Sequence, residues 1–215
     1  MTNDYVQARE RMVAEQLVSR GIKDPRVLRA MAKIPRHLFL ENELWDHAYE
    51  DHPLQIGANQ TISQPYIVAL MVEALELKGT ERVLEVGTGS GYAAAVLSEL
   101  CAEVFSVEVV QELALKARIL LKNLGYRNVS LLAGDGTLGW EEYSPYDAVI
   151  ISAAAPCIPR PLVEQLKIPG YLVFPMGEEE LQILVRIRKE RAGIREEYLG
   201  DCHFVKLTGR YGWEN

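Results

Sequence analysis

The sequence is poor in cysteine and has no long apolar run. Its three cysteines are too few and too scattered for a disulfide framework or a zinc cluster: Cys101, Cys157 and Cys202. The longest apolar run covers about eight positions, 148–155, and is interrupted by Ser152, whereas a membrane span needs roughly 20. The first residues lack the basic and then apolar layout of a signal peptide. We therefore expect a cytoplasmic protein without a membrane partner.

Basic charge is also in deficit. Lys and Arg number 23 against 30 Asp and Glu, which gives a net charge of −7. Proteins that bind nucleic acid over a broad face are usually basic, so we expect no nucleic-acid partner. With 48% hydrophobic and 25% charged residues, the 215-residue chain has the composition of an ordinary globular protein of about one domain. We expect it to act as a monomer.

The pattern of the chain changes near residue 77. Residues 1–77 predict helices and loops, with a loop-rich stretch over 35–64 and a helix that begins at Pro65. We interpret this part as a helical N-terminal cover. Residues 78–215 are expected to form the core, and the two parts to form one integrated domain.

Short apolar runs alternate with helical segments in the core. Strands are predicted at 83–86, 104–108, 129–133 and 148–152, with helices at 92–100 and 111–124. Strands that are apolar on both faces and alternate with helices indicate a parallel sheet covered by helices. The tail predicts further strands at 171–174, 181–188 and 198–207 with little helix between them. The expected fold is therefore α/β, an open, doubly wound, mostly parallel Rossmann-like sheet with antiparallel C-terminal strands.

A glycine-rich loop joins the first of these strands to a helix. Its three alternate glycines, within residues 87–91, are costly for a plain turn and indicate that a ligand approaches the backbone. Tyr92 stands where a dinucleotide fingerprint needs its last glycine, and no lysine follows as in a P-loop. Thr88 and Tyr92 flank Ser90 where a nucleophile elbow needs glycines. These three nucleotide and hydrolase motifs are therefore disfavoured.

Acidic residues follow the next two strands. Glu108 ends the second strand, at the spacing where a carboxylate accepts both hydroxyls of a ribose. Asp135, between two glycines, ends the third and could accept from an adenine amino group. The alternatives are a solvated strand end and an Asp-Gly turn. Together the loop and the acids suggest a nucleoside without pyrophosphate, such as S-adenosylmethionine. Glu85, inside the first strand, is interpreted as an organiser of the loop.

Several segments carry a resemblance to one family, in the same order from near the start to near the end of the chain. They are residues 60–65, 83–92, 128–129, 134–136, 146–150, 153–156, 175–178 and 204–208. The chain resembles the protein-L-isoaspartate (D-aspartate) O-methyltransferases, which are class I S-adenosylmethionine-dependent methyltransferases. The glycine loop alone marks only the broad methyltransferase class, whereas residues 61–65 and 153–156 are far more specific.

The resemblance implies a repair enzyme and a set of site residues. The enzyme would methylate the free α-carboxylate of L-isoaspartyl residues in damaged proteins, and the ester would re-close to a succinimide. The implied contacts are Glu85, Gly87, Thr88, Gly89, Gly91, Glu108, Asp135 and Gly136 for the cofactor, Ser63 for catalysis, and Thr61, Ile62, Ala154 and Pro156 for the substrate. No metal site is expected. Ser152 stands where the family usually has threonine, and Lys206 replaces a common proline, which leaves the path of the last strand open.

The implied reaction needs little acid–base chemistry. The acceptor carboxylate has a reference pKa of about 3.5, so it is already ionised at neutral pH. A site that aligns it with the methyl donor and excludes water should suffice. Two other functions stay open: a methyltransferase of RNA or a small molecule, and a cofactor-binding module without catalysis. Ser63 could also be only the N-cap of the helix that begins at Pro65.

Overall fold

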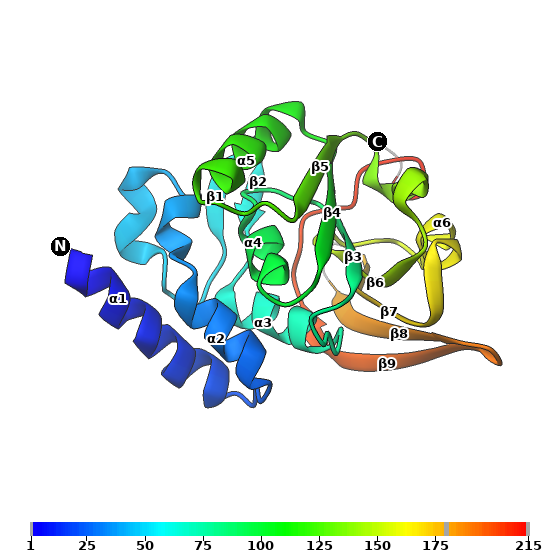
Figure 1. Cartoon of the computed structure of the whole chain (residues 1–215), viewed down its shortest axis with the longest axis horizontal. Coiled ribbons are helices and arrows are strands. Elements are labelled where there is room, and N and C mark those ends of the chain that lie inside the picture. Colours follow the sequence, from blue (N-terminus) through cyan, green and yellow to red (C-terminus); the bar gives the residue numbers. More distant parts are fainter. Residues whose placement is uncertain (1, 179–180, 214–215) are drawn as a thin grey trace.

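The computed structural model describes residues 2–178 and 181–213, and a seven-stranded sheet forms the centre of this part (Figure 1). The strand order is β5-β4-β3-β6-β7-β8-β9. The strands are β3 (Arg82–Val86), β4 (Glu103–Glu108), β5 (Val129–Ala133), β6 (Tyr146–Ile151), β7 (Leu166–Gly177), β8 (Gln182–Glu190) and β9 (Gly193–Cys202). All pairs from β5 to β7 are parallel, and β8 and β9 add antiparallel strands. The predicted sheet is confirmed.

Helices connect the parallel strands. They are α4 (Tyr92–Ser98) after β3, α5 (Gln111–Asn123) after β4 and α6 (Arg160–Glu164) before β7. The last four residues of β3 are buried, and so are five of the six residues of β6. Both faces of these strands are covered, which is why their sequences are apolar runs without alternation.

The N-terminal part is mainly helical, as predicted. It contains α1 (Thr2–Arg11), the π-helical turns of η1 (Met12–Val18), α2 (Pro25–Lys33), the 3₁₀ turns η2 (Arg36–Phe39) and η3 (Asn42–His47), and α3 (Pro65–Glu73). In Figure 1, α1 and α2 lie side by side at the end of the molecule away from the β8–β9 hairpin. Met12 and Met31 from this part belong to the same buried cluster as Val104 of the sheet. The cover therefore shares a hydrophobic core with the sheet.

Residues 35–64 are more regular than the sequence predicts. They contain a small antiparallel hairpin, β1 (Leu54–Gly57) and β2 (Gln60–Ile62). Its turn residues, Ala58 and Asn59, have positive φ angles of 51° and 56°, as the central residues of a type I′ hairpin turn do. Ile56 of the hairpin lies against Gly89 of the glycine loop, so tertiary packing supports strands that are too short to be recognised by pattern.

The predicted last strand, 198–207, is wrong in its bounds. Strand β9 begins at Gly193 and ends at Cys202, and the chain then leaves the edge of the sheet. The tail, drawn in red in Figure 1, passes beside the residues that follow β6. There the amide of Leu207 donates to the carbonyl of Ala154 at 2.9 Å. Some of residues 203–207 are apolar because the segment covers the carboxyl ends of the strands. The segment does not extend the sheet.

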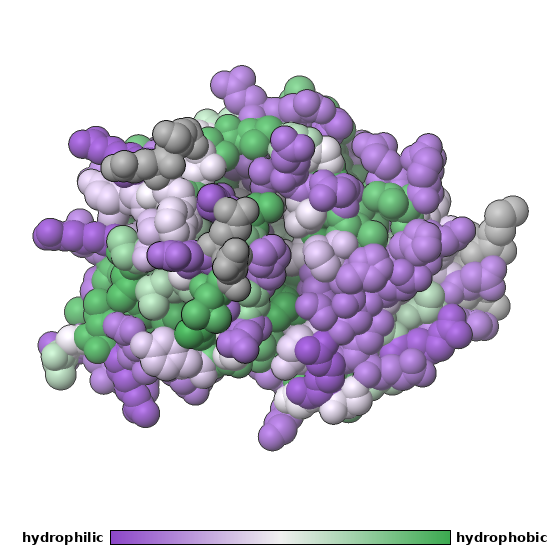
Figure 2. Space-filling model, turned by 180° about the vertical axis from the view of Figure 1, so that it is seen from behind, coloured by the Kyte–Doolittle hydropathy of each residue, from purple (hydrophilic) through white to green (hydrophobic). Residues whose placement is uncertain are grey.

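The surface seen from behind is mainly hydrophilic (Figure 2). Apolar residues on this side form separate patches between the charged ones. The most exposed large apolar residues of the described part of the chain are Leu181, just before β8, and Tyr198, within the edge strand β9, at 67% and 63%. No helix within residues 2–178 and 181–213 has the length and apolar character needed to cross a bilayer.

Candidate active site

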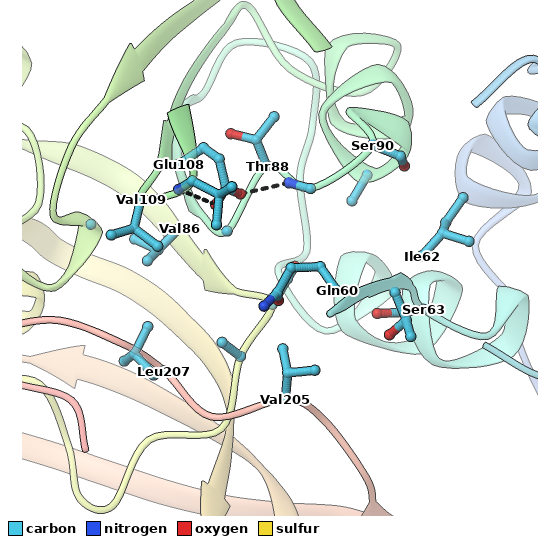
Figure 3. Close-up of a pocket in the computed structure, with 18 of the residues that line it drawn as sticks. Gln60, Ile62, Ser63, Val86, Thr88, Ser90, Glu108, Val109, Val205 and Leu207 are labelled. Carbon is cyan, nitrogen blue, oxygen red and sulfur yellow. Dashed lines mark hydrogen bonds between the residues drawn. The ribbon is translucent and has the colours of Figure 1, made fainter. Parts of the chain in front are cut away.

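A cavity of about 270 Å³ opens at the carboxyl ends of β3, β4 and β6. This is the edge at which open α/β sheets bind their ligands. Its walls come from the glycine loop, the segments after β4 and β6, the β1–β2 hairpin and the C-terminal tail, mainly residues 86–90, 108–110, 152–153, 60–63 and 205–208, with Gly136. In Figure 3, Glu108 and Val109 lie on one side, Gln60 and Ser63 on the opposite side, and Val205 and Leu207 below.

The glycine loop has the backbone conformation that its sequence requires. Gly87 and Gly89 have positive φ angles of 91° and 53°, where side-chain-bearing residues are strained. Both line the cavity. Gly91 has a φ of 88° but lies outside the lining, where it forms the N-cap of α4. A Cβ at Gly91 would come within 3.3 Å of Leu121, so this glycine serves the packing of α4 against α5.

Glu108 connects the end of β4 to the glycine loop. Its side chain is buried, and its two oxygens accept from the amides of Gly89 at 2.8 Å and Val110 at 2.9 Å, as the dashed lines in Figure 3 mark. A carboxylate has about four acceptor positions, so these two bonds leave capacity for a ligand. Glu108 lines the cavity and fixes the loop opposite it.

Glu85 lies behind the glycine loop and not in the cavity lining. It is fully buried, and the hydroxyl of Ser106 donates to its Oε2. The hydroxyl oxygens of Ser106 and Thr88 are 2.5 Å apart, so the carboxyl group is linked to the loop through two hydroxyls. The atom Oε1 has no partner among the described residues. Burial raises the pKa of Glu85 to about 8. Ser106, which no sequence pattern singled out, links Glu85 to the loop residue Thr88.

Replacing Glu85 by glutamine is expected to raise the free energy of unfolding more at pH 8 than at pH 5, without cofactor. The pKa of about 8 in the folded protein lies above the ordinary 4.5. The folded state therefore keeps a proton that the unfolded chain loses, so stability falls as the pH rises between these values. Glutamine removes this dependence. Urea unfolding at both pH values measures it, with the exposed Glu112→Gln as control. An equal effect at the two pH values would contradict a buried, protonated carboxyl group.

Asp135 faces the tail. Its Oδ1 accepts from the amide of Thr137 at 2.9 Å and from the hydroxyl of Thr137 at 2.6 Å. Its Oδ2 accepts from the amide of Arg210 at 2.8 Å. Asp135 lies outside the cavity lining, whereas Gly136 is part of it. A Cβ at Gly136 would lie 2.5 Å from Val86, so only glycine fits here. The predicted contact of Asp135 with adenine stays a prediction.

A second pocket adjoins the first. It lies between the start of α3, the end of β9 and the tail, with Arg20, Tyr66 and His203 among its lining residues. The residues common to both pockets are Thr61, Ser63, Ser152 and Val205. Ser63 therefore stands at the boundary between the two spaces. Its interpretation as a helix cap is wrong, because the N-cap residue of α3 is Gln64.

The predicted substrate contacts divide into two groups. Thr61 lines both pockets and Ile62 lines the first, although its side chain is 4% exposed. Ala154 is fully buried and pairs with Lys206 of the tail, and Pro156 is exposed; both lie outside the two linings. Their neighbours Ser152 and Ala153 line the first pocket instead. The tail residues 205–208 were missed as a wall of the site.

Comparisons with known proteins agree with this geometry. Residues 7–212 match the model of the family described as protein-L-isoaspartate(D-aspartate) O-methyltransferase. A protein-L-isoaspartate O-methyltransferase of Syntrophus aciditrophicus is 55% identical and covers 99% of each chain, and that of Geobacter metallireducens is 55% identical over 96% of each.

Solved structures give the same result. A protein-L-isoaspartate O-methyltransferase superposes with a TM-score of 0.86 at 30% identity, over 95% of this chain and 67% of the other. A Plasmodium falciparum protein assigned to the same activity, solved with S-adenosyl-L-homocysteine, gives a TM-score of 0.78 at 26% identity over 93% of this chain and 98% of the other.

Proposed function

The chain belongs to the protein-L-isoaspartate(D-aspartate) O-methyltransferase family, and on this basis we propose that it methylates the free α-carboxylate of L-isoaspartyl residues in damaged proteins, with S-adenosylmethionine as methyl donor. One observation carries the proposal. A cavity at the carboxyl ends of the strands meets a second pocket at Thr61 and Ser63. Two reactants can therefore approach each other from opposite sides of one boundary.

The first cavity suits the methyl donor. Gly87 and Gly89 expose their backbone to it, and Glu108 presents a buried carboxylate that suits ribose hydroxyls. Gly136 leaves room beside Val86 where a side chain would not fit. When bound, S-adenosylmethionine supplies a methyl group on a positively charged sulfur. We propose that Gly87, Gly89, Glu108 and Gly136 hold it together with Thr88, which also lines the cavity, and that Glu85 supports the loop from behind.

The second pocket suits the peptide substrate. The residues between the two pockets would align its carboxylate with the methyl donor and exclude water from the reacting atoms. The acceptor carboxylate is ionised at neutral pH, so no residue has to remove a proton from it. We propose that the Ser63 hydroxyl donates a hydrogen bond to this carboxylate and that Thr61 contacts the peptide. Ala153, Val205 and Leu207 are apolar walls that exclude water. Opposite charges neutralise each other in the transition state, so removing water favours the reaction, and alignment can contribute about 7–11 kcal/mol.

We propose that residues 1–77 cover the substrate site of the core formed by 78–215. The buried cluster that the two parts share supports their forming one integrated domain. We further propose that the enzyme acts in the cytoplasm, as a monomer and without nucleic acid. The net charge of −7 supports the last of these.

A methyl-transfer assay tests the function directly. The protein is incubated with methyl-tritiated S-adenosylmethionine and, separately, an isoaspartyl peptide, its normal aspartyl twin and RNA. We expect base-labile label in the isoaspartyl peptide alone. Equal labelling of the aspartyl twin, or labelling of RNA, would overturn the proposal. Cofactor binding without label in any acceptor would indicate a binding module without catalysis.

A further inference from the structure

Arg36 is a buried arginine close to the proposed catalytic residue. It lies at the start of η2, and its side chain is 0% exposed. Fully buried arginines are rare, because removing a guanidinium from water costs several kcal/mol unless its donors are satisfied. Burial lowers the pKa of Arg36 to about 10, so the group stays charged at neutral pH. A charge kept in this position calls for a structural reason.

The guanidinium connects two segments that are distant in sequence. Its Nε donates to the carbonyl of Ala48 at 2.8 Å, and its Nη2 donates to the carbonyl of Ser63 at 2.8 Å. The guanidinium carbon, Cζ, lies 4.8 Å from the ring centre of Tyr92, the first residue of α4. Arg36 therefore joins two places within the N-terminal cover, Ala48 and the segment after β2, to the helix that follows the glycine loop.

The contact with Ser63 falls where the backbone has no regular element to hold it. Ser63 lies after the end of β2 at Ile62 and before the start of α3 at Pro65. The orientation of its peptide group decides where its side chain points, and the charged hydrogen bond from Arg36 fixes that group. Such bonds to a charged donor are about twice as strong as neutral ones.

We propose that Arg36 is a positioning residue for methyl transfer. It holds the Ser63 backbone so that the serine hydroxyl stays at the boundary between the cofactor cavity and the second pocket. This inference rests on the proposed function and on the role proposed for Ser63. Lysine cannot replace Arg36 fully, because a single ammonium group does not reproduce the planar fork that reaches both carbonyls.

A double-mutant cycle tests the inference. Arg36→Met is expected to lower kcat about tenfold and Arg36→Lys about threefold, while the Kd of S-adenosylhomocysteine changes less than twofold. In a Ser63→Ala background, Arg36→Met should lower kcat less than twofold further, because there is no hydroxyl left to position. If Arg36→Met does not fold, the cycle is run with Arg36→Lys.

A matched variant separates positioning from general stability. Arg186 is also poorly exposed, at 15% of its side chain, and lies 4.4 Å over the ring of Tyr171, but it lines neither pocket. Any loss from Arg186→Met should multiply with that from Ser63→Ala. Multiplying losses for Arg36, or no effect of Ser63→Ala alone, would overturn the inference. A wild-type protein that does not label isoaspartyl peptides would instead refute the proposed function.

Discussion

The Glu108→Ala variant is expected to bind S-adenosylhomocysteine about 100-fold more weakly than the wild type. The substitution removes the acceptors proposed for the ribose hydroxyls, and hydrogen bonds to charged groups contribute about 1.5–3 kcal/mol each. It also frees the amides of Gly89 and Val110, which Glu108 now holds, so the glycine loop loses part of its preorganisation. A loss of about 2.7 kcal/mol corresponds to a 100-fold change in Kd.

Isothermal titration calorimetry measures this effect. Glu112→Ala is the matched control, because Glu112 lies in the first turn of α5, is exposed and pairs with Lys116 one turn along the same helix. It removes one negative charge near the site without removing a cavity residue. A Kd for Glu108→Ala that equals that of the control would contradict the ribose assignment.

The Ser63→Ala variant is expected to lower kcat/KM for an isoaspartyl peptide by about 10- to 100-fold. The physical reason is the loss of one hydrogen bond to a charged carboxylate, roughly 1.5–3 kcal/mol. The carbonyl that Arg36 holds is unchanged by the substitution, so the backbone should stay in place. The Kd of S-adenosylhomocysteine should therefore change less than twofold.

Steady-state kinetics and calorimetry together separate these effects. Ser130→Ala is a suitable control, because Ser130 is exposed on the edge strand β5 and lines neither pocket. Unchanged turnover in Ser63→Ala would remove Ser63 from the mechanism. A large rise in the Kd of the cofactor would place its effect on binding instead.

The sheet and the position of the glycine loop are the parts that the sequence predicted best. Strands β3 and β6 are buried on both faces, so their apolar runs carry the signal directly. Gly87 and Gly89 follow the end of β3 and Glu108 is the last residue of β4, and parallel strands bring their carboxyl ends to one edge. For residues at the end of a parallel strand, the local sequence is therefore enough to predict that they lie at the site.

The segments that close the site were harder to predict. The β1–β2 hairpin depends on packing such as that of Ile56 against Gly89, more than 30 residues away in sequence. The path of the tail depends on the pairing of Lys206 with Ala154. The orientation of Asp135 depends on the hydrogen bond that it accepts from the amide of Arg210 in the tail. Arg36 shows no local signal, because a buried arginine and an exposed one look alike in sequence. These features rest on tertiary contacts that periodicity does not report.

The pH dependence of turnover tests the central claim most directly. With the proposed substrate, the acceptor carboxylate reaches the site already ionised, so that no group has to act as general base. At saturating cofactor, kcat/KM for an isoaspartyl peptide is therefore predicted to vary less than about threefold between about pH 5.5 and pH 7.5. A tenfold fall per pH unit on the acidic side of that range would report an essential base and would contradict the account.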